Sequence, residues 1–220
     1  MSRIVDLTAT ITTATGVIGH PPVRLEPIHT HEKHGRANTQ ITLSLHTGTH
    51  VDAPVHFDPR GIGVDAIALE RLIGPAMKID LRQRAKPKTA ITVEDIRQAP
   101  GFAEPLADHI VVLHTGWNKA MFGKPNYYTD NPYLATATAE WLAAQRIRAL
   151  GLDTPQDKYE GEPRHGDFPV HRTFLGKGIP FIEHIENLDR VDRDRFQLIA
   201  LPIKVQGADG APARVVAVLE

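Results

Sequence analysis

The sequence predicts an α/β fold, and three observations support this prediction. Segments typical of strands and of helices alternate through the middle of the chain. One stretch, residues 41–57, alternates apolar with polar side chains at the period of a β-strand. The composition, with 41% hydrophobic and 23% charged residues, is that of an ordinary globular protein. The 220 residues are enough for one domain with a substantial core.

The first half of the chain contains three expected strands and one short helix. Residues 41–57 place apolar or β-branched side chains at odd positions and mostly polar ones at even positions, as in a strand with one buried face. Apolar or β-branched runs at 76–82 and 109–115 indicate two further strands. Thr92 precedes Asp95 by three residues, which is the capping-box pattern that begins a short helix.

The second half contains one longer helix and the remaining strands. Residues 138–150 are rich in Ala, Leu, Gln and Arg, which favour a helix. This segment runs into a strand that ends at Pro155, because proline cannot donate to a sheet. Further strands are expected over 179–185 and 197–205, a turn over 207–213 and a long loop over 156–170, and the run RVVAVL (214–219) closes the chain.

Composition and charge exclude several classes of function. Lys and Arg number 25 against 26 Asp and Glu, so no electrostatic argument favours nucleic acid or an anionic membrane surface as a partner. The chain has no cysteine, which excludes disulfides, thiolate metal sites and a cysteine nucleophile. No run approaches the roughly 18 apolar residues that a membrane span needs, and the first ten residues lack an apolar core. We therefore expect a cytoplasmic location.

Three histidines and an aspartate lie within residues 46–57, HTGTHVDAPVHF. His46, His50, Asp52 and His56 all occupy even positions, so an extended strand directs them to one face. A helix would also bring His46 and His50 together, as in zinc proteases, but the Gly, Pro, Thr and Val of the segment disfavour it. A solvated polar face is the alternative to a site, and four functional groups at matched positions favour the site.

A straight strand could not gather these groups around one metal ion. His46 and His56 would lie about 33 Å apart at roughly 3.3 Å per residue, whereas each metal–ligand bond is only about 2 Å long. Gly48 can adopt the backbone angles of a tight turn, and Pro54 ends strand pairing. We therefore expect the segment to bend at both positions and to form a metal-binding cup.

The segment resembles the HxGTHxDxPxHF signature of the metal-dependent cyclase-like hydrolases, which include bacterial kynurenine formamidase, isatin hydrolase and some polyketide cyclases. Four further stretches resemble the family in the same order: ERLIGPAMKIDL (70–81), VVLHTGWNKA (111–120), ALGLDTPQDK (149–158) and IPFIEHIENL (179–188). The resemblance therefore covers nearly the whole chain. It implies a single swivelling β/β/α domain over residues 1–220, in which helices flank a central mixed sheet.

The resemblance also implies the roles of six residues. The first metal would be bound by His46, His50 and Asp52, and the second by Asp52, His171 and Glu183, with Glu183 also touching the first. His56 would be the general acid/base. The imidazole and carboxylate ligands suit one or two Zn²⁺ ions, with Mn²⁺ as the alternative.

The late ligands are also plausible from their local sequence. Glu183 lies in an apolar run, where an unpaired buried carboxylate would be costly and a metal could balance it. A surface position on an edge strand is the alternative for this residue. His165 competes with His171 for the same role, because both belong to the long loop region. His184 and Glu186 are expected to point elsewhere or to follow the strand.

Two regions depart from the family pattern. Residues 16–35 correspond to a segment in which kynurenine formamidases carry Trp-Pro-Gly-Asp, and here no tryptophan is present, which disfavours formylkynurenine as substrate. This segment contains four histidines, either as an exposed or substrate-facing loop or as a second metal cluster: His20, His29, His31 and His34. His114 stands where relatives carry an arginine and would alter the charge preference if it faced the pocket.

We expect hydrolysis of an amide or ester bond, in an aryl formamide, a cyclic amide or a lactone. Bound metal would activate water and polarise the carbonyl group, and His56 would carry the proton to the leaving group. A metal-dependent cyclase or dehydratase is the alternative enzyme, and a non-catalytic metal- or ligand-binding protein is the alternative from another class. The expected partner is a small-molecule substrate, and the resemblance implies a homodimer or homotetramer.

Overall fold

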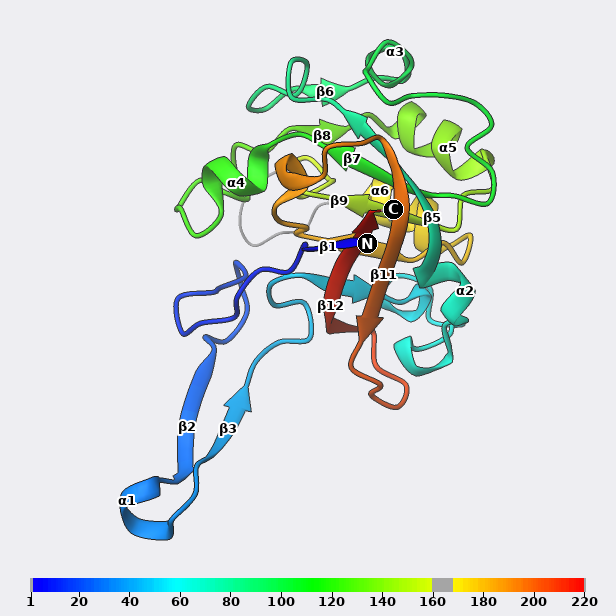
Figure 1. Ribbon diagram of the computed structural model, residues 1–220. Coiled ribbons are helices and arrows are strands. Elements are labelled where there is room, and N and C mark those ends of the chain that lie inside the picture. The colour runs from blue at the N-terminus through cyan, green and yellow to red at the C-terminus, as the bar shows by residue number, and fades with distance from the viewer. Residues whose placement is uncertain (1, 160–167, 220) are drawn as a thin grey trace.

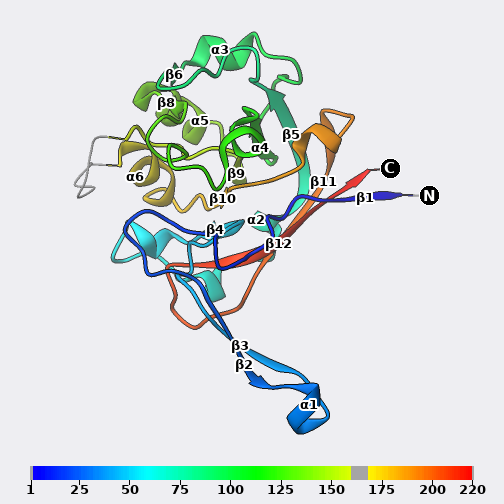
Figure 2. The same ribbon diagram turned by 90° about the vertical axis from the view of Figure 1, so that its left-hand side faces the viewer.

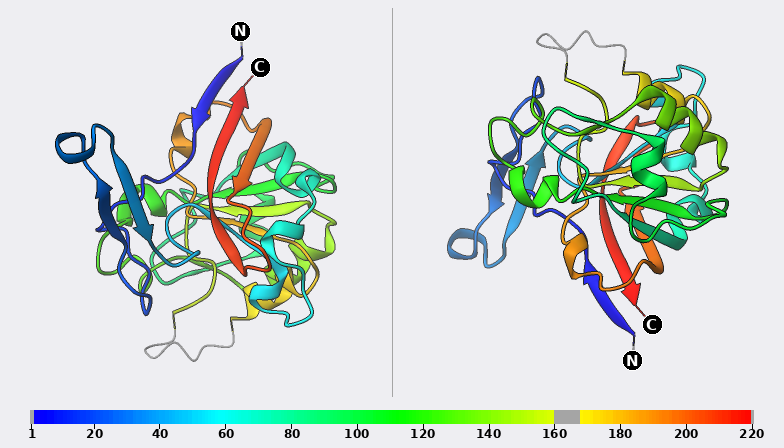
Figure 3. Two further views of the ribbon diagram at one scale, coloured as in Figure 1. Left: turned by 90° about the horizontal axis from the view of Figure 1, so that it is seen from below. Right: turned by 90° about the horizontal axis from the view of Figure 1, so that it is seen from above.

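Seven strands close into a ring in the computed structural model, which describes residues 2–159 and 168–219 (Figure 1). In spatial order the ring consists of β12 (Gly210–Leu219), β11 (Arg195–Pro202), β5 (Ile73–Asp80), β7 (Ile110–His114), β9 (Ala149–Leu152), β10 (Phe181–Glu183) and β4 (His50–Asp52). The ring closes because β4 pairs with both β10 and the first residues of β12. An eighth strand, β1 (Arg3–Asp6), pairs with the end of β12, so the two chain ends are neighbours (Figure 3).

The sheet is mixed in direction. Strands β5, β7, β9 and β10 run parallel, and β11, β12 and β4 join them by antiparallel pairing. Helical segments lie in the connections: α2 (Leu69–Leu72), α3 (Val93–Arg97), α4 (Trp117–Met121), α5 (Thr136–Ala144), α6 (Pro169–Leu175), and the 3₁₀ turns η1 (Pro54–His56), η2 (Val64–Ala66) and η3 (Leu188–Arg190). A small parallel pair, β6 (Ala90–Ile91) and β8 (Tyr133–Leu134), lies outside the ring. The predicted α/β fold with a mixed sheet flanked by helices is confirmed.

The parallel strands are apolar on both faces because each face has its own partner. In β7, Ile110 and Val112 belong to the core inside the ring, together with residues of β11 and β12. Val111 and Leu113 point the other way and pack with the side chains of α3, α5 and α6. Figure 2 shows these helices together on one side of the ring. This explains why residues 109–115 form a continuous apolar run, as expected for a strand buried on both faces.

A hairpin arm projects from the opposite side of the ring (Figures 1 and 2). It consists of β2 (Arg24–His29), the short helix α1 (His31–His34) and β3 (Asn38–Thr42), with β2 and β3 paired antiparallel. Every residue of β3 is exposed, and the arm presents three large apolar side chains to solvent: Leu25, Ile28 and Ile41.

The prediction of one strand over residues 41–57 is wrong. The chain leaves the arm after β3, crosses an irregular stretch, enters the short strand β4 and then turns into η1. The two expected bends are nevertheless present. Gly48 has φ +65°, and Pro54 begins η1. The alternation of side chains therefore reflects a folded cup rather than a long ladder.

The other element predictions differ from the structure mainly at their ends. The capping box of Thr92 and Asp95 begins α3 as expected. The helix expected over 138–150 ends earlier, since α5 spans Thr136–Ala144 and β9 takes the following apolar residues. The turn expected over 207–213 is shorter, because β12 already begins at Gly210. The loop expected over 156–170 gives way to α6 at Pro169, and its residues 160–167, including His165, lie outside the described residues. No helix among the described residues is long and apolar enough to cross a membrane.

Candidate metal centre

Strand pairing brings the first ligand candidates together. Strand β4 lies between β10 and the start of β12, and His50 is directly opposite Glu183 across the β4–β10 pair. His50 and Asp52 are two residues apart and share one face of β4, while Val51 between them is buried in the ring core. The position of Glu183 on a strand paired on both sides excludes the alternative of a surface position on an edge strand.

Six predicted residues converge at this place, from five parts of the chain. His46 comes from the stretch before β4, His56 from η1 and His171 from α6, and they join His50, Asp52 and Glu183 on the strands. The carboxylate of Asp52 is central to the cluster. Its Oδ1 lies 2.7 Å from His46 Nδ1 and 3.1 Å from His50 Nε2, and its Oδ2 lies 3.7 Å from His171 Nε2.

Glu183 provides the second carboxylate of the cluster. Its Oε1 lies 3.3 Å from His171 Nε2, and its Oε2 lies 3.6 Å from His50 Nε2. Gln156 donates from Nε2 to Glu183 and approaches His171 Nε2. The carboxylate of Asp157 contacts Nδ1 of His171 and thereby orients the His171 ring. Two buried carboxylates thus face each other among imidazole rings. Their burial is costly in free energy unless positive charge lies between them.

The residues fit a divalent metal ion. His50 Nδ1 hydrogen-bonds the carbonyl oxygen of Gly48 at 2.8 Å, which assigns the proton to Nδ1. Nε2 of His50 then carries a lone pair, is buried and has no hydrogen-bond partner in the described structure. An imidazole held by its second nitrogen beside carboxylates is the usual arrangement of a metal ligand. Several groups of three residues can each hold an ion here, among them His46, His50 and Asp52.

The carboxylates also shift the pKa values of the surrounding histidines. Burial lowers the pKa of His46, but Asp52 and Asp209 outweigh it and raise the value to about 9. Burial likewise disfavours charge on His171, yet its hydrogen bonds to Asp157 and Glu183 raise its pKa to about 10. Burial and Asp52 oppose ionisation of Glu183, but His171 and His50 lower its pKa to about 2. Without metal, protons on the imidazoles therefore balance the carboxylates.

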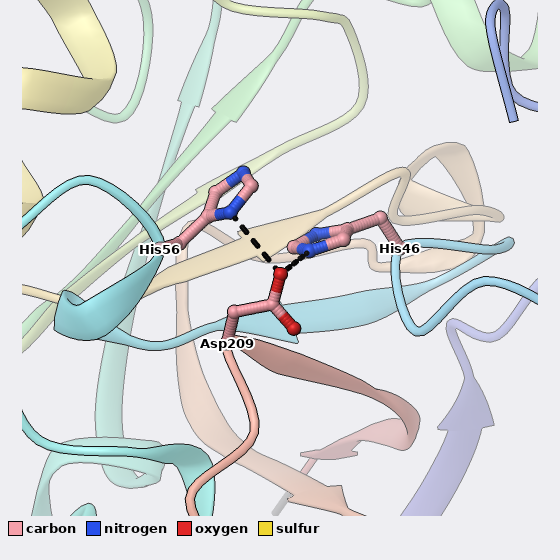
Figure 4. Close-up of side chains that lie close together, drawn as sticks. All are labelled: His46, His56 and Asp209. Atoms are coloured by element: carbon pink, nitrogen blue, oxygen red, sulfur yellow. Dashed lines mark hydrogen bonds and ion pairs between the residues drawn. The ribbon is translucent and has the colours of Figure 1, made fainter. Parts of the chain in front are cut away.

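His56 differs from the ligand candidates in its electrostatics and contacts. Burial lowers its pKa below the usual value, so the ring is neutral near pH 7. Its ring stacks on that of His46 with the centroids 4.1 Å apart. Figure 4 shows the carboxylate of Asp209 next to both rings. Asp209 Oδ2 lies 3.0 Å from His46 Nε2 and 3.4 Å from His56 Nδ1.

Asp209 is a residue that the sequence did not indicate. It lies in the segment expected only to form a turn, immediately before β12, far from the 46–57 motif along the chain. The pairing of β4 with β12 sets Asp52 opposite Gly210 and so carries Asp209 to the cluster. No local pattern could have revealed this contact.

Other histidines differ from their expected positions. His184 follows the end of β10, as one of the two expectations stated, and it nevertheless lines the cavity. His20 also lines the cavity, whereas His29, His31 and His34 lie on the projecting arm, and no metal-binding group is found among these four in the described residues. His114 does not line the cavity. It is buried beside Asp153, and burial lowers its pKa to about 4.

The cluster forms the floor of a cavity of about 440 Å³. This volume is in the range of small-molecule sites. The walls are largely apolar or aromatic: Val17, Ile18, Phe57, Tyr128 and Phe168. Phe57 stacks on the ring of His171, with the centroids 4.7 Å apart. The cavity therefore combines a polar, metal-compatible floor with walls suited to a flat apolar group.

Comparison with known proteins agrees with this geometry. A family model described as a putative cyclase matches residues 5–157. Kynurenine formamidase of Bacillus cereus is 30% identical over 203 residues, covering 90% of this chain and 88% of that protein. The structure of isatin hydrolase A from Labrenzia aggregata bound to benzyl benzoate has a TM-score of 0.85 and 28% identity, covering 99% of this chain and 94% of that one. A potential metal-dependent hydrolase with cyclase activity has a TM-score of 0.79 and 28% identity, covering 100% of this chain and 99% of that one.

The similar proteins match nearly the whole chain, and the family model, over residues 5–157, includes the 46–57 motif. The resemblance inferred from that motif is confirmed, and so is the prediction of an enzyme of the hydrolase class. The chain belongs to the putative cyclase family.

Proposed function

We propose that the protein is a metal-dependent hydrolase that cleaves the amide bond of a small aromatic substrate. The observation that carries the proposal is the convergence of the motif residues, His171 and Glu183 on the floor of one apolar-walled cavity. The proposed metal ligands are His46, His50, Asp52, His171 and Glu183. The proposed proton carrier is His56. The similarity to kynurenine formamidase and isatin hydrolase A supports this class of reaction.

The ligand set supports Zn²⁺, in one or two sites, with Mn²⁺ as the competitor. Imidazole suits zinc, and a higher share of carboxylate and water would suit manganese. When bound, the metal would supply a Lewis acid that polarises the carbonyl group and lowers the pKa of water. Asp52 can serve two sites, since its two oxygens face different histidines.

His56 performs the proton transfer in this proposal. Its neutral ring accepts a proton from the water that adds to the carbonyl carbon. The same proton then passes to the leaving nitrogen as the carbon–nitrogen bond breaks, so the products are an amine and a carboxylic acid, which releases its proton to solvent at neutral pH. Asp209 holds His56 Nδ1 and thereby orients the ring for both steps.

The walls of the cavity favour a flat aromatic amide. Phe57, Phe168 and Tyr128 offer ring faces and edges, while Val17 and Ile18 close the cavity on the side of the N-terminal segment. An aryl formamide or a cyclic amide fused to an aromatic ring fills such a site and directs its carbonyl to the floor. A lactone of the same shape is the ester counterpart.

A substrate screen tests the proposal. Formanilides, isatins, aromatic lactones and cyclic imides are incubated with the Zn²⁺- and Mn²⁺-loaded protein, and products are analysed by mass spectrometry in ¹⁸O-labelled water. Hydrolysis incorporates one labelled oxygen into the carboxylate. Turnover without label would instead indicate a cyclase or dehydratase. Full activity in metal-free protein would contradict the proposal.

The exposed arm supports a homo-oligomer, in which the apolar side chains Leu25, Ile28 and Ile41 contact a second copy of the chain. Light scattering coupled to size-exclusion chromatography is expected to give the molar mass of a homodimer or homotetramer. The variant Ile28→Glu should shift this molar mass toward that of the monomer. A monomeric wild-type protein would contradict this part. One domain over residues 1–220 is also proposed, since β1, near the start of the chain, pairs with β12, near its end, in the same sheet. A cytoplasmic location stays a prediction.

A further inference from the structure

His184 is a buried histidine that the proposed mechanism does not use. It directly follows Glu183 and lines the cavity floor, and only 3% of the residue is exposed. Its Nε2 lies 3.6 Å from Glu183 Oε2, and its ring centroid lies 5.4 Å from that of His50. His50, Glu183 and His184 each offer one ligand atom, and these atoms all lie within 4.8 Å of one another.

The second nitrogen of His184 is held by a tyrosine. Tyr127 is fully buried, and its hydroxyl lies 2.7 Å from His184 Nδ1. The same hydroxyl donates its single proton to Asn118 Oδ1 at 2.9 Å, so it accepts a hydrogen bond from His184 Nδ1–H. The proton of the neutral ring is therefore on Nδ1, and the lone pair on Nε2 faces the floor of the cavity.

The backbone holds His184 in a conformation that is unusual for histidine. Its φ is +53°, in the left-handed region that few residues other than glycine adopt. The carbonyl oxygen of His184 accepts a hydrogen bond from the Thr49 hydroxyl at 2.7 Å, and the next amide donates to Leu152. This backbone turns the ring toward the cluster, although the residue follows the last residue of β10.

We propose that His184 Nε2 is a further ligand of the metal ion bound by His50, in the group that these two histidines form with Glu183. The inference rests on the proposed metal site and extends its ligand set. Tyr127 acts as the positioning residue, because its hydroxyl selects the tautomer that leaves Nε2 unprotonated. A further imidazole ligand favours Zn²⁺, Co²⁺ or Ni²⁺ over Mn²⁺ and Mg²⁺.

The direct test is a crystal structure of the wild-type protein loaded with Zn²⁺, with the ion located by anomalous scattering. The proposal expects the ion at about 2.0–2.1 Å from His184 Nε2. An ion bound to His46, His50 and Asp52 but more than about 3 Å from His184 would overturn the inference and leave the proposed function intact. A protein that binds no ion would overturn both.

Metal affinity gives the second measurement. Competition with a chromophoric chelator should show that His184→Gln weakens Zn²⁺ binding by at least about tenfold. The visible spectrum of the Co²⁺-loaded variant should also change, because one nitrogen ligand is lost. Tyr127→Phe, which keeps the ring of His184 but removes its partner, should have a smaller effect in the same direction.

His114→Gln is the matched control for these variants. His114 is buried to the same degree as His184, with 3% exposed, but it does not line the cavity. This variant should keep the affinity and the Co²⁺ spectrum of the wild type. Unchanged Zn²⁺ affinity and an unchanged Co²⁺ spectrum in His184→Gln would overturn the proposal. Weaker Zn²⁺ binding in both His184→Gln and His114→Gln would show that substitution of any buried histidine weakens binding, and this result would also contradict the proposal.

Discussion

The three histidines and the aspartate of residues 46–57 differ in their contacts, although they belong to one short motif. His50 is held by a carbonyl oxygen through Nδ1, and its Nε2 faces two carboxylates, as expected of a ligand. His56 has a lowered pKa and contacts Asp209. The two imidazoles are equivalent in the sequence pattern but not in their surroundings.

Removal of the His56 ring should separate catalysis from metal binding. We expect His56→Ala to retain bound metal and to lose about 10²- to 10⁴-fold in kcat, because only proton transfer is removed. Elemental analysis and single-substrate kinetics provide the measurement. His109→Ala, which changes a histidine outside the cavity, is the control. A kcat equal to that of the wild type, with metal bound, would remove His56 from the mechanism.

Asp209 should affect both the metal and the proton carrier, since it touches His46 and His56. In Asp209→Asn the hydrogen bond to His46 loses its charge, and metal affinity should fall about 10- to 100-fold. The value of kcat at saturating metal should also fall, because His56 is less well oriented. Asp58→Asn is the control, as Asp58 pairs with exposed Arg60. Equal losses of metal affinity and kcat in Asp209→Asn and Asp58→Asn would show that the loss of one negative charge, and not the contacts of Asp209 with His46 and His56, causes the effect.

At the scale of elements, the site depends on the bend between the arm and β4. Gly48 has φ +65°, its carbonyl oxygen accepts the hydrogen bond from His50, and a Cβ at this position would lie 3.2 Å from Ile11 Cγ1. The bend therefore sets the ring orientation of His50. Pro54, in turn, begins η1 and directs His56 back toward the cavity.

Gly48→Ala should lower both stability and metal affinity. The left-handed backbone alone costs about 1–2 kcal/mol for alanine, and the contact with Ile11 adds to it. Denaturant unfolding and chelator competition measure the two effects. Gly178→Ala is a close control, because Gly178 has φ +70° with open space around its Cβ position. It should lose stability but keep metal affinity. Intact affinity in Gly48→Ala would show that the bend does not position the ligand.

For the whole molecule, the buried histidines predict how stability depends on pH. His46 and His171 have folded pKa values of about 9 and 10, above the ordinary value of 6.5. Their contribution to the free energy of unfolding is therefore complete below pH 6.5 and disappears as the pH rises through 9 and 10. His114 and His184, with pKa values of about 4, act in the opposite direction, so stability falls as the pH drops from 6.5 to 4.

The metal-free protein should accordingly be most stable near pH 6.5, and its Tm should fall on both sides. With Zn²⁺ bound, the ligands have already released their protons, so the fall between pH 7 and 10 should be much smaller. Thermal unfolding from pH 4 to 10.5, with and without metal, gives the measurement. A Tm of the metal-free protein that stays constant between pH 7 and 10 would contradict the proton balance described for the cluster.

Much of the fold and of the candidate site follows from local pattern. Apolar runs located β5, β7, β9 and β10, because strands buried on both faces need apolar side chains throughout. The spacing of His46, His50, Asp52 and His56, together with Gly48 and Pro54, indicated a bent metal-binding segment. These features depend on residues close together in the chain, where backbone geometry alone limits the possibilities.

The remaining features depend on contacts between distant segments. Asp209 reaches the cluster only because β4 pairs with β12, and Glu183 lies opposite His50 only because β4 also pairs with β10. His184 faces the cavity through a left-handed backbone that Thr49 and Leu152 hold in place. Strand partners and non-local hydrogen bonds are determined by the free energy of the whole packed ring, so no short stretch of sequence contains them.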